Sequence, residues 1–192
     1  MKLAVFDSME ECTDAEVQRM LLLVSPQRRE QALRYKHTLG RFCCIKSWLM
    51  LNELMPQSQI PMPDWQYNEH GKPFLPNGPY FSISHCKDGI AVVVDNQPIG
   101  VDIESLRSAN QDLIERTMNA EEQAQIAEAA DRERAFVRLW TQKEAMVKAQ
   151  GRGIESFEQL QNVLSIGGRI ESFETEKYIY SIAYGELSGF RP

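Results

Sequence analysis

Two short segments carry acidic side chains at a spacing that suits a divalent cation. The first has the sequence GVDIE at residues 100–104. A strand, with its period of two, places Asp102 and Glu104 on one face with their Cα atoms about 6.8 Å apart. Both carboxylates then reach one cation and repel each other without it, and Gly100 leaves room beside them. For this segment alone, an exposed polar strand face is the alternative interpretation.

The second segment has the sequence WTQKEAMVK at residues 140–148 and predicts a helix. The helical period places Lys143 inside the apolar stripe, with Glu144 and Lys148 along its edge. Because lysine is rarely buried without a partner, we interpret these charges as facing a site. The alternative is a snorkelling Lys143 beside an ordinary Glu144–Lys148 helix ion pair.

The two segments together offer oxygen ligands for a hard cation. Asp102, Glu104 and Glu144, completed by water and phosphate oxygens, would suit the octahedral preference of Mg²⁺. The chain has only three histidines and no CxxC pair, which argues against zinc. The side chains available for phosphates are Lys72, His85, Lys143 and Lys148. This combination favours phosphoryl-type transfer, in which positioning and charge neutralisation carry most of the catalysis.

A third segment, FSISHC at residues 81–86, ends a predicted strand with Ser84 and His85. A serine hydrolase is the competing hypothesis. Neighbouring strand residues point to opposite faces, so we discount a Ser84–His85 nucleophile pair. A phosphate could instead meet the chain where this strand ends.

The charge and the composition limit the classes of protein to which this chain can belong. The chain has 192 residues, of which 43% are apolar and 25% charged, as in globular proteins. Its net charge of −6 argues against general nucleic-acid binding. Residues 28–46 nevertheless hold six basic side chains and one acidic, which suits a multiply phosphorylated ligand or an acidic partner. A solvated helix face remains the alternative for that segment.

We expect no membrane attachment. Apolar runs such as residues 21–24 and 90–94 are far shorter than a membrane span, and the N-terminus lacks a signal-peptide pattern. The four cysteines show no disulfide-framework spacing and are expected to be reduced thiols. A cytoplasmic location follows as an expectation.

The pattern of elements predicts an α+β fold in two parts. Capping signals at Thr13 and Ser25 open helices, and Gly151 closes a long one. The expected helices cover residues 40–55, 111–118 and 132–150, with another after Asn119. The expected strands cover residues 1–6, 80–84, 90–94, 99–104, 163–166 and 178–183, with 169–173 as an added partner, and residues 56–79 are loop-rich. The turn at residues 95–98 is a plausible boundary between the two parts, and it predicts halves at residues 1–97 and 98–192.

The two acidic segments, in this order and spacing, resemble the signature of the 4'-phosphopantetheinyl transferase superfamily. SPQRRE at residues 25–30, GKP at 71–73 and SISH at 82–85 resemble further motifs of its surfactin-synthetase-activating type. The resemblance spans residues 1 to about 155. It implies a single-chain, monomeric pseudo-dimer of two similar α+β halves, with the active site in the cleft between them.

By this resemblance, the enzyme would move 4'-phosphopantetheine from coenzyme A to a serine hydroxyl of an apo acyl or peptidyl carrier protein. The products would be holo carrier protein and adenosine 3',5'-bisphosphate. Mg²⁺ would be bound by Asp102, Glu104 and Glu144; Glu144 would also help to deprotonate the serine. Lys148 would contact the pyrophosphate and stabilise the leaving group. The nucleotide end of coenzyme A would be held by Arg28, Arg41, Lys72, Pro73, Ser84 and His85.

Two other classes of function compete with this one. A metal-dependent phosphoester hydrolase could use the same carboxylates without any carrier serine. A noncatalytic module that binds coenzyme A or the carrier would tolerate loss of Glu144.

Overall fold

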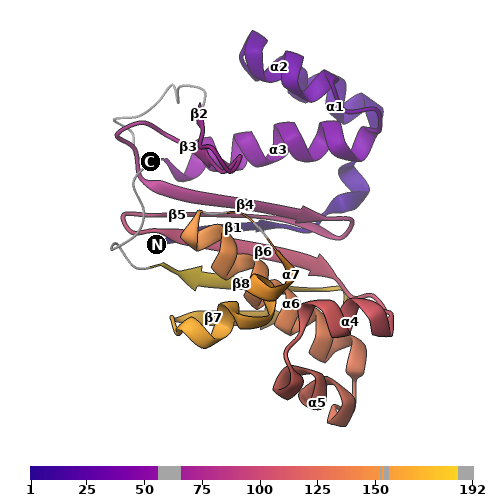
Figure 1. Cartoon of the computed structure of the whole chain (residues 1–192). Helices are drawn as coiled ribbons and strands as arrows, with labels where there is room; N and C mark the ends of the chain where they lie inside the picture. The colour runs from indigo at the N-terminus through magenta and orange to yellow at the C-terminus, as the bar shows by residue number, and fades with distance from the viewer. Residues whose placement is uncertain (56–65, 152, 154–155, 186–192) are drawn as a thin grey trace.

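Two antiparallel three-stranded sheets form the centre of the molecule (Figure 1). The computed structural model describes residues 1–55, 66–151, 153 and 156–185. The first sheet has the order β1 (Lys2–Phe6), β5 (Gly89–Asp95), β4 (Tyr80–Cys86), and the second the order β6 (Ile99–Ser105), β8 (Tyr178–Tyr184), β7 (Ile170–Glu174). In both sheets the strand that comes last in the chain lies between the other two. A short ribbon pairs β2 (Gln66–Tyr67) with β3 (Pro73–Phe74).

The sheets lie face to face, and each carries one long helix on its outer side (Figure 1). Alternation along β5 turns Ile90, Val92 and Val94 toward α3 (Thr38–Leu54), whose Phe42 and Ile45 share their core. The other face of β5 turns Ala91 and Val93 toward the second sheet, where they pack with the β6 side chains Ile99, Val101 and Ile103. The remaining face of the second sheet packs on α6 (Arg132–Gln150). The α+β prediction is confirmed.

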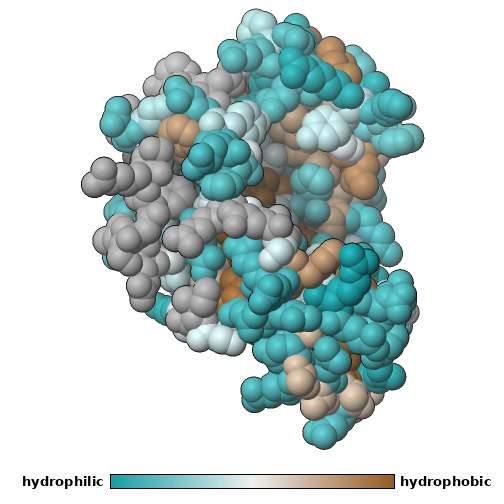
Figure 2. All heavy atoms as spheres, viewed as in Figure 1, coloured by the Kyte–Doolittle hydropathy of each residue, from teal (hydrophilic) through white to brown (hydrophobic). Residues whose placement is uncertain are grey.

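Shorter helices flank this four-layer arrangement. They are α1 (Asp14–Leu21), α2 (Pro26–Leu33), α4 (Gln111–Thr117), α5 (Ala120–Glu128), α7 (Phe157–Asn162) and the 3-10 helices η1 (Met9–Glu11) and η3 (Val163–Ile166). None of the helices in the described ranges is long and apolar enough to cross a membrane. In the view of Figure 2, hydrophobic side chains gather in a recess between the N-terminal helices and the C-terminal elements, and charged and polar groups cover most of the remaining surface.

Local capping explains where the helices begin and end. The Thr13 side chain accepts a hydrogen bond from the Glu16 N–H, and Ser25 caps α2 in the same way with Pro26 as the first helical residue. The spacing of Thr13 and Glu16 also predicts the reciprocal bond of a capping box, from the Thr13 N–H to the Glu16 carboxylate; in the structure the Thr13 N–H donates to the Glu11 oxygen, and the Glu16 carboxylate pairs with Arg19. Gly151 ends α6 with a φ of 74°, a left-handed conformation that glycine adopts without steric cost.

One predicted strand is wrong. Residues 163–166 form η3, which follows directly on α7, a helix that the sequence did not predict. A short apolar run such as this one has no period long enough to separate helix from strand. The partner of β8 is instead β7, at the place expected for the added strand. Of the loop-rich stretch predicted at 56–79, residues 56–65 lie outside the described residues.

Candidate active site

The strand and the helix that carry the acidic segments lie directly against each other. The face of β6 that holds Gly100, Asp102 and Glu104 looks toward α6. A Cβ atom on Gly100 would overlap the carbonyl oxygen of Ala145 and lie 2.5 Å from the backbone nitrogen of Ala149. We expected Gly100 to leave room beside the carboxylates, and that expectation is wrong because the α6 backbone fills the space. The glycine instead permits this close approach.

An ion pair joins the two segments. Lys148 Nζ on α6 lies 2.6 Å from Asp102 Oδ1, and the Ser84 hydroxyl donates to the same oxygen at 2.7 Å. Lys148 Nζ also donates to Ser84 Oγ at 2.9 Å. The ion pair that the structure describes for Lys148 therefore runs to Asp102 rather than to Glu144. Three elements, β4, β6 and α6, meet at one charged cluster.

Glu104 and Glu144 complete the acidic side of this cluster. Burial raises the pKa of Glu104, and the nearby Asp102 carboxylate raises it further. Burial likewise raises the pKa of Glu144, and both Asp102 and Glu104 add to that increase. The mutual effect means that the three carboxylates, from β6 and α6, share one electrostatic environment. Lys148 offsets part of their repulsion by lowering the pKa of both glutamates.

A cavity of about 310 Å³ opens beside the cluster. Its wall includes Glu144 and Lys148 from α6 and the 71–73 segment with Lys72 and Pro73. The other lining residues are His70, Phe81, Ser82, Ile83, Val147, Gly151 and Gly153. One carboxylate, two ammonium groups and an apolar wall thus face one space, as expected of a site for a charged, partly apolar ligand, while Asp102 and Glu104 lie outside its lining.

Lys72 ties this segment to α6. Its ammonium donates to the backbone oxygen of Lys148 at 2.5 Å, and burial lowers the pKa of Lys72 to about 8. Asn68, which sequence reasoning missed, accepts from the N–H groups of His70 and Lys72 and donates to the Gly151 oxygen at 2.9 Å. An asparagine before a glycine-containing turn is a known turn former, and this signal could have identified it.

Lys143 does not face the cavity, contrary to the sequence prediction of a contact with the phosphates. Its side chain has no exposed surface; Nζ lies 2.8 Å from Glu122 Oε2 and donates to the Leu160 oxygen at 2.6 Å. Glu122 is itself the capping-box residue of α5. Lys143 thus lies in the apolar stripe because a buried carboxylate and a helix-end carbonyl satisfy its charge.

The remaining predicted residues lie around the cluster at different depths. Arg28 on α2 is buried over the Trp48 ring, 4.2 Å from its centroid, and donates to Gln31. Arg41 donates to the Tyr35 oxygen near the start of α3. His85 is exposed near the end of β4, and Ser84 contacts Asp102 and Lys148 rather than lining the cavity.

The acidic cluster fits a hard cation in its chemistry but is not arranged as a finished metal cage. Asp102 Oδ2 is buried, and no described residue supplies it with a hydrogen-bond partner. A cation would satisfy this oxygen and lower the raised pKa values of the two glutamates. Within the described ranges, no set of three or more His, Cys, Asp and Glu side chains is grouped closely enough to hold a metal. Mg²⁺ commonly takes few protein ligands and completes its shell with water and phosphates.

Comparison with known proteins agrees with this geometry. Residues 98–184 match the family model of the 4'-phosphopantetheinyl transferase superfamily. The 4'-phosphopantetheinyl transferase Sfp of Bacillus subtilis is 28% identical over 147 residues, which cover 72% of this chain and 65% of the relative. The 4'-phosphopantetheinyl transferase AcpT of Salmonella typhi is 37% identical over 112 residues, 55% of this chain and 58% of the relative.

The matched region contains both β6 and α6. This region, slightly less than half of the chain, is similar to the 4'-phosphopantetheinyl transferase superfamily, and the relatives support that family. It spans slightly less than two thirds of the length of the Bacillus subtilis relative.

Proposed function

We propose that this chain is a 4'-phosphopantetheinyl transferase that moves phosphopantetheine from coenzyme A to a serine of an apo acyl or peptidyl carrier protein. The observation that carries the proposal is the meeting of Asp102 and Lys148, from β6 and α6, beside a cavity that Lys72 also lines. The Glu144 carboxylate and the ammonium groups on this cavity, with Asp102 next to it, suit a diphosphate ligand with a bound cation. The products are holo carrier protein and adenosine 3',5'-bisphosphate.

In this proposal the serine hydroxyl attacks the phosphorus next to pantetheine. The bond from that phosphorus to the bridging diphosphate oxygen breaks, and the nucleotide leaves. Glu144 accepts the serine proton, directly or through water, from its position on the cavity wall. The Lys148 ammonium neutralises the oxygen on the departing nucleotide.

Asp102, Glu104 and Glu144 would hold Mg²⁺, which would neutralise the diphosphate and make its phosphorus more electrophilic. Lys72 and Pro73 on the cavity wall would contact coenzyme A directly. Arg28, Arg41, Ser84 and His85 are proposed for its nucleotide end, and Arg28 would have to leave its position over Trp48 to reach a phosphate. Lys143 has a structural role in this proposal.

We also propose that the chain is a pseudo-dimer with halves 1–97 and 98–192, and that it acts as a cytoplasmic monomer. The shared strand order of the two sheets, with a long helix after the first strand of each, supports the pseudo-dimer. The site would then lie between the halves, where Ser84 of β4 meets Asp102 of β6.

The test is an incubation with an apo carrier protein, coenzyme A and Mg²⁺, followed by intact-mass spectrometry of the carrier. We expect a gain of one phosphopantetheinyl group on the carrier serine, and adenosine 3',5'-bisphosphate in equal amount. Release of free phosphopantetheine with an unmodified carrier would identify a hydrolase instead. Coenzyme binding without turnover, unchanged in Glu144→Gln, would identify a binding module.

A further inference from the structure

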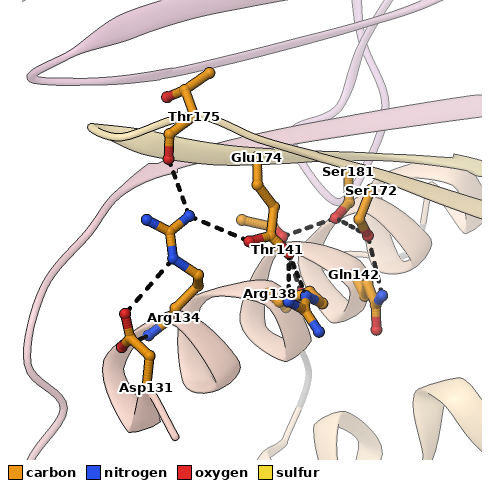
Figure 3. A network of polar contacts seen from close by, with 9 residues as sticks. All are labelled: Asp131, Arg134, Arg138, Thr141, Gln142, Ser172, Glu174, Thr175 and Ser181. Carbon is orange, nitrogen blue, oxygen red and sulfur yellow. Dashed lines mark hydrogen bonds and ion pairs between the residues drawn. The ribbon is translucent and has the colours of Figure 1, made fainter.

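A chain of buried and half-buried polar groups connects α6 to the second sheet (Figure 3). Thr141 and Ser181 have no exposed surface, and their hydroxyl oxygens lie 2.8 Å apart. Ser172 Oγ lies 2.9 Å from Ser181 Oγ, and Gln142 Nε2 donates to Ser172 Oγ at 3.0 Å. At the other end, Thr141 Oγ1 donates to the Arg138 oxygen at 2.9 Å.

Counting donors gives a consistent direction for this chain. Each hydroxyl has one hydrogen, the Gln142 amide can only donate through its nitrogen, and the Arg138 carbonyl can only accept. With the Thr141 hydrogen on the Arg138 oxygen, Ser181 donates to Thr141 and Ser172 donates to Ser181. The distances also allow the reverse direction between the hydroxyls, and sliding α6 along the sheet would break the series in either case.

The register of the strands places this contact beside the proposed site. In the β6–β8 pair, Ser181 is directly opposite Asp102, so both side chains lie on the face that looks toward α6. On α6, Thr141 lies two helical turns before Lys148 and one turn before Glu144, on the same stripe. Asp102 contacts Lys148, and its cross-strand neighbour contacts Thr141.

The helix thus has two fixed contacts on this face. Gly100 admits the α6 backbone at Ala145 and Ala149, and this close approach sets the distance between helix and sheet. The hydroxyl pair is directional, and it sets the position of the helix along its own axis. Because a helix rises about 1.5 Å and turns about 100° per residue, a register shift of one residue would turn Glu144 and Lys148 away from the face that looks toward Asp102.

We propose that the Thr141–Ser181 hydroxyl pair is a positioning element, which holds α6 in the register that brings Glu144 and Lys148 to the β6 carboxylates. This inference rests on the proposed function for its kinetic consequences and on the fold for its geometry. Neither hydroxyl touches a substrate. Their contribution is to hold Glu144 in the alignment that metal binding requires and Lys148 in the alignment that transfer requires.

The test compares Thr141→Val, which keeps the shape and removes the hydroxyl, with Thr141→Ser, which keeps the hydroxyl. Each is assayed for transfer and, separately, for Mn²⁺ binding by the free-ion electron paramagnetic resonance signal in the presence of coenzyme A. For Thr141→Val we expect kcat to fall about tenfold and the Mn²⁺ dissociation constant to rise severalfold. The KM for coenzyme A should change less than kcat, because Arg28 and Arg41, which are proposed for its nucleotide end, lie on α2 and α3 rather than on α6. Thr141→Ser should behave like the parent protein.

Two control variants separate positioning from loss of stability. Ile45→Val trims a fully buried side chain of α3 in the other sheet's core, and Arg138→Ala removes an exposed ion pair of α6 with Glu174. Both should keep the parent kcat and Mn²⁺ affinity, whatever their melting temperatures. The proposal is overturned if Thr141→Val matches Ile45→Val in kcat and Mn²⁺ affinity at a similar loss of melting temperature. Should the parent protein transfer nothing, the proposed function fails, and the Mn²⁺ affinities alone decide the positioning role.

Discussion

Replacing Lys148 by methionine should strengthen metal binding while it weakens catalysis. In the structure the Lys148 ammonium lies 2.6 Å from Asp102 Oδ1, where a metal ion would also need to bind. The lysine is therefore a cation of the chain itself that competes for the site. Removing its charge frees Asp102 and takes away a like charge next to the incoming ion.

The size of the effect follows from the exposure of the pair. Hydrogen bonds between charged groups contribute about 1.5–3 kcal/mol. The Asp102 side chain is 5% exposed and that of Lys148 29% exposed, so solvent weakens the pair and the lower end applies. A gain of about 1.4 kcal/mol corresponds to about tenfold tighter binding of Mn²⁺.

The assay is a titration of the coenzyme-free protein with Mn²⁺, in which the electron paramagnetic resonance signal measures the free ion. Lys148→Met should bind about tenfold more tightly than the parent, and Lys148→Arg, which keeps the charge, should bind like the parent. The same Lys148→Met variant should transfer phosphopantetheine about a hundredfold more slowly. Equal or weaker Mn²⁺ binding by Lys148→Met would refute the competition between lysine and metal.

Three further predictions concern the surroundings of the site. Burial lowers the pKa of Lys72 to about 8 in the folded chain, so its contribution to stability increases as pH rises from about 8 toward the pKa of the unfolded chain. Phosphates of coenzyme A next to Lys72 should restore its proton. Calorimetry near pH 8.5 in two buffers should therefore show proton uptake on coenzyme A binding, and Lys72→Met should show none. Glu122→Gln breaks the buried Glu122–Lys143 ion pair and should lower the free energy of unfolding in urea by about 3–5 kcal/mol. The double variant Glu122→Leu, Lys143→Met should recover most of that free energy and leave the affinity for coenzyme A unchanged. A large loss of affinity in the double variant would show that Lys143 takes part in binding coenzyme A. Gly100→Ala should lower the stability of the protein more than Gly71→Ala does. A Cβ at Gly71 would meet nothing within 4 Å, so Gly71→Ala costs only the backbone strain of a φ of 80°, about 1 kcal/mol. Equal unfolding midpoints in urea for the two variants would contradict the close approach of α6 to Gly100.

The acidic side chains were placed correctly on their elements because both elements have a clear period. Alternation along residues 99–104 assigns Asp102 and Glu104 to one face, and α6 has the bounds that its capping residues and apolar stripe predict. A local pattern also gave the caps at Ser25 and Gly151. Each of these features depends on residues that are close in the chain.

The features that sequence reasoning missed depend on partners far away in the chain. Lys143 lies inside the apolar stripe because of Glu122, a residue on another helix. Lys148 pairs with Asp102 across the two elements, although Glu144 is its neighbour on the same helix. The space next to Gly100 is filled by the α6 backbone at Ala145 and Ala149, more than forty residues later in the chain. A single sequence gives no signal for such contacts.

The central claim is that β6 and α6 together bind one divalent ion over the diphosphate of coenzyme A. A crystal structure of the protein with coenzyme A and Mn²⁺, measured for anomalous scattering, tests it most directly. We predict one anomalous peak within about 2.5 Å of carboxylate oxygens of Asp102, Glu104 and Glu144, in contact with the diphosphate. Bound coenzyme A with the peak elsewhere, or with none at these side chains, would contradict the account.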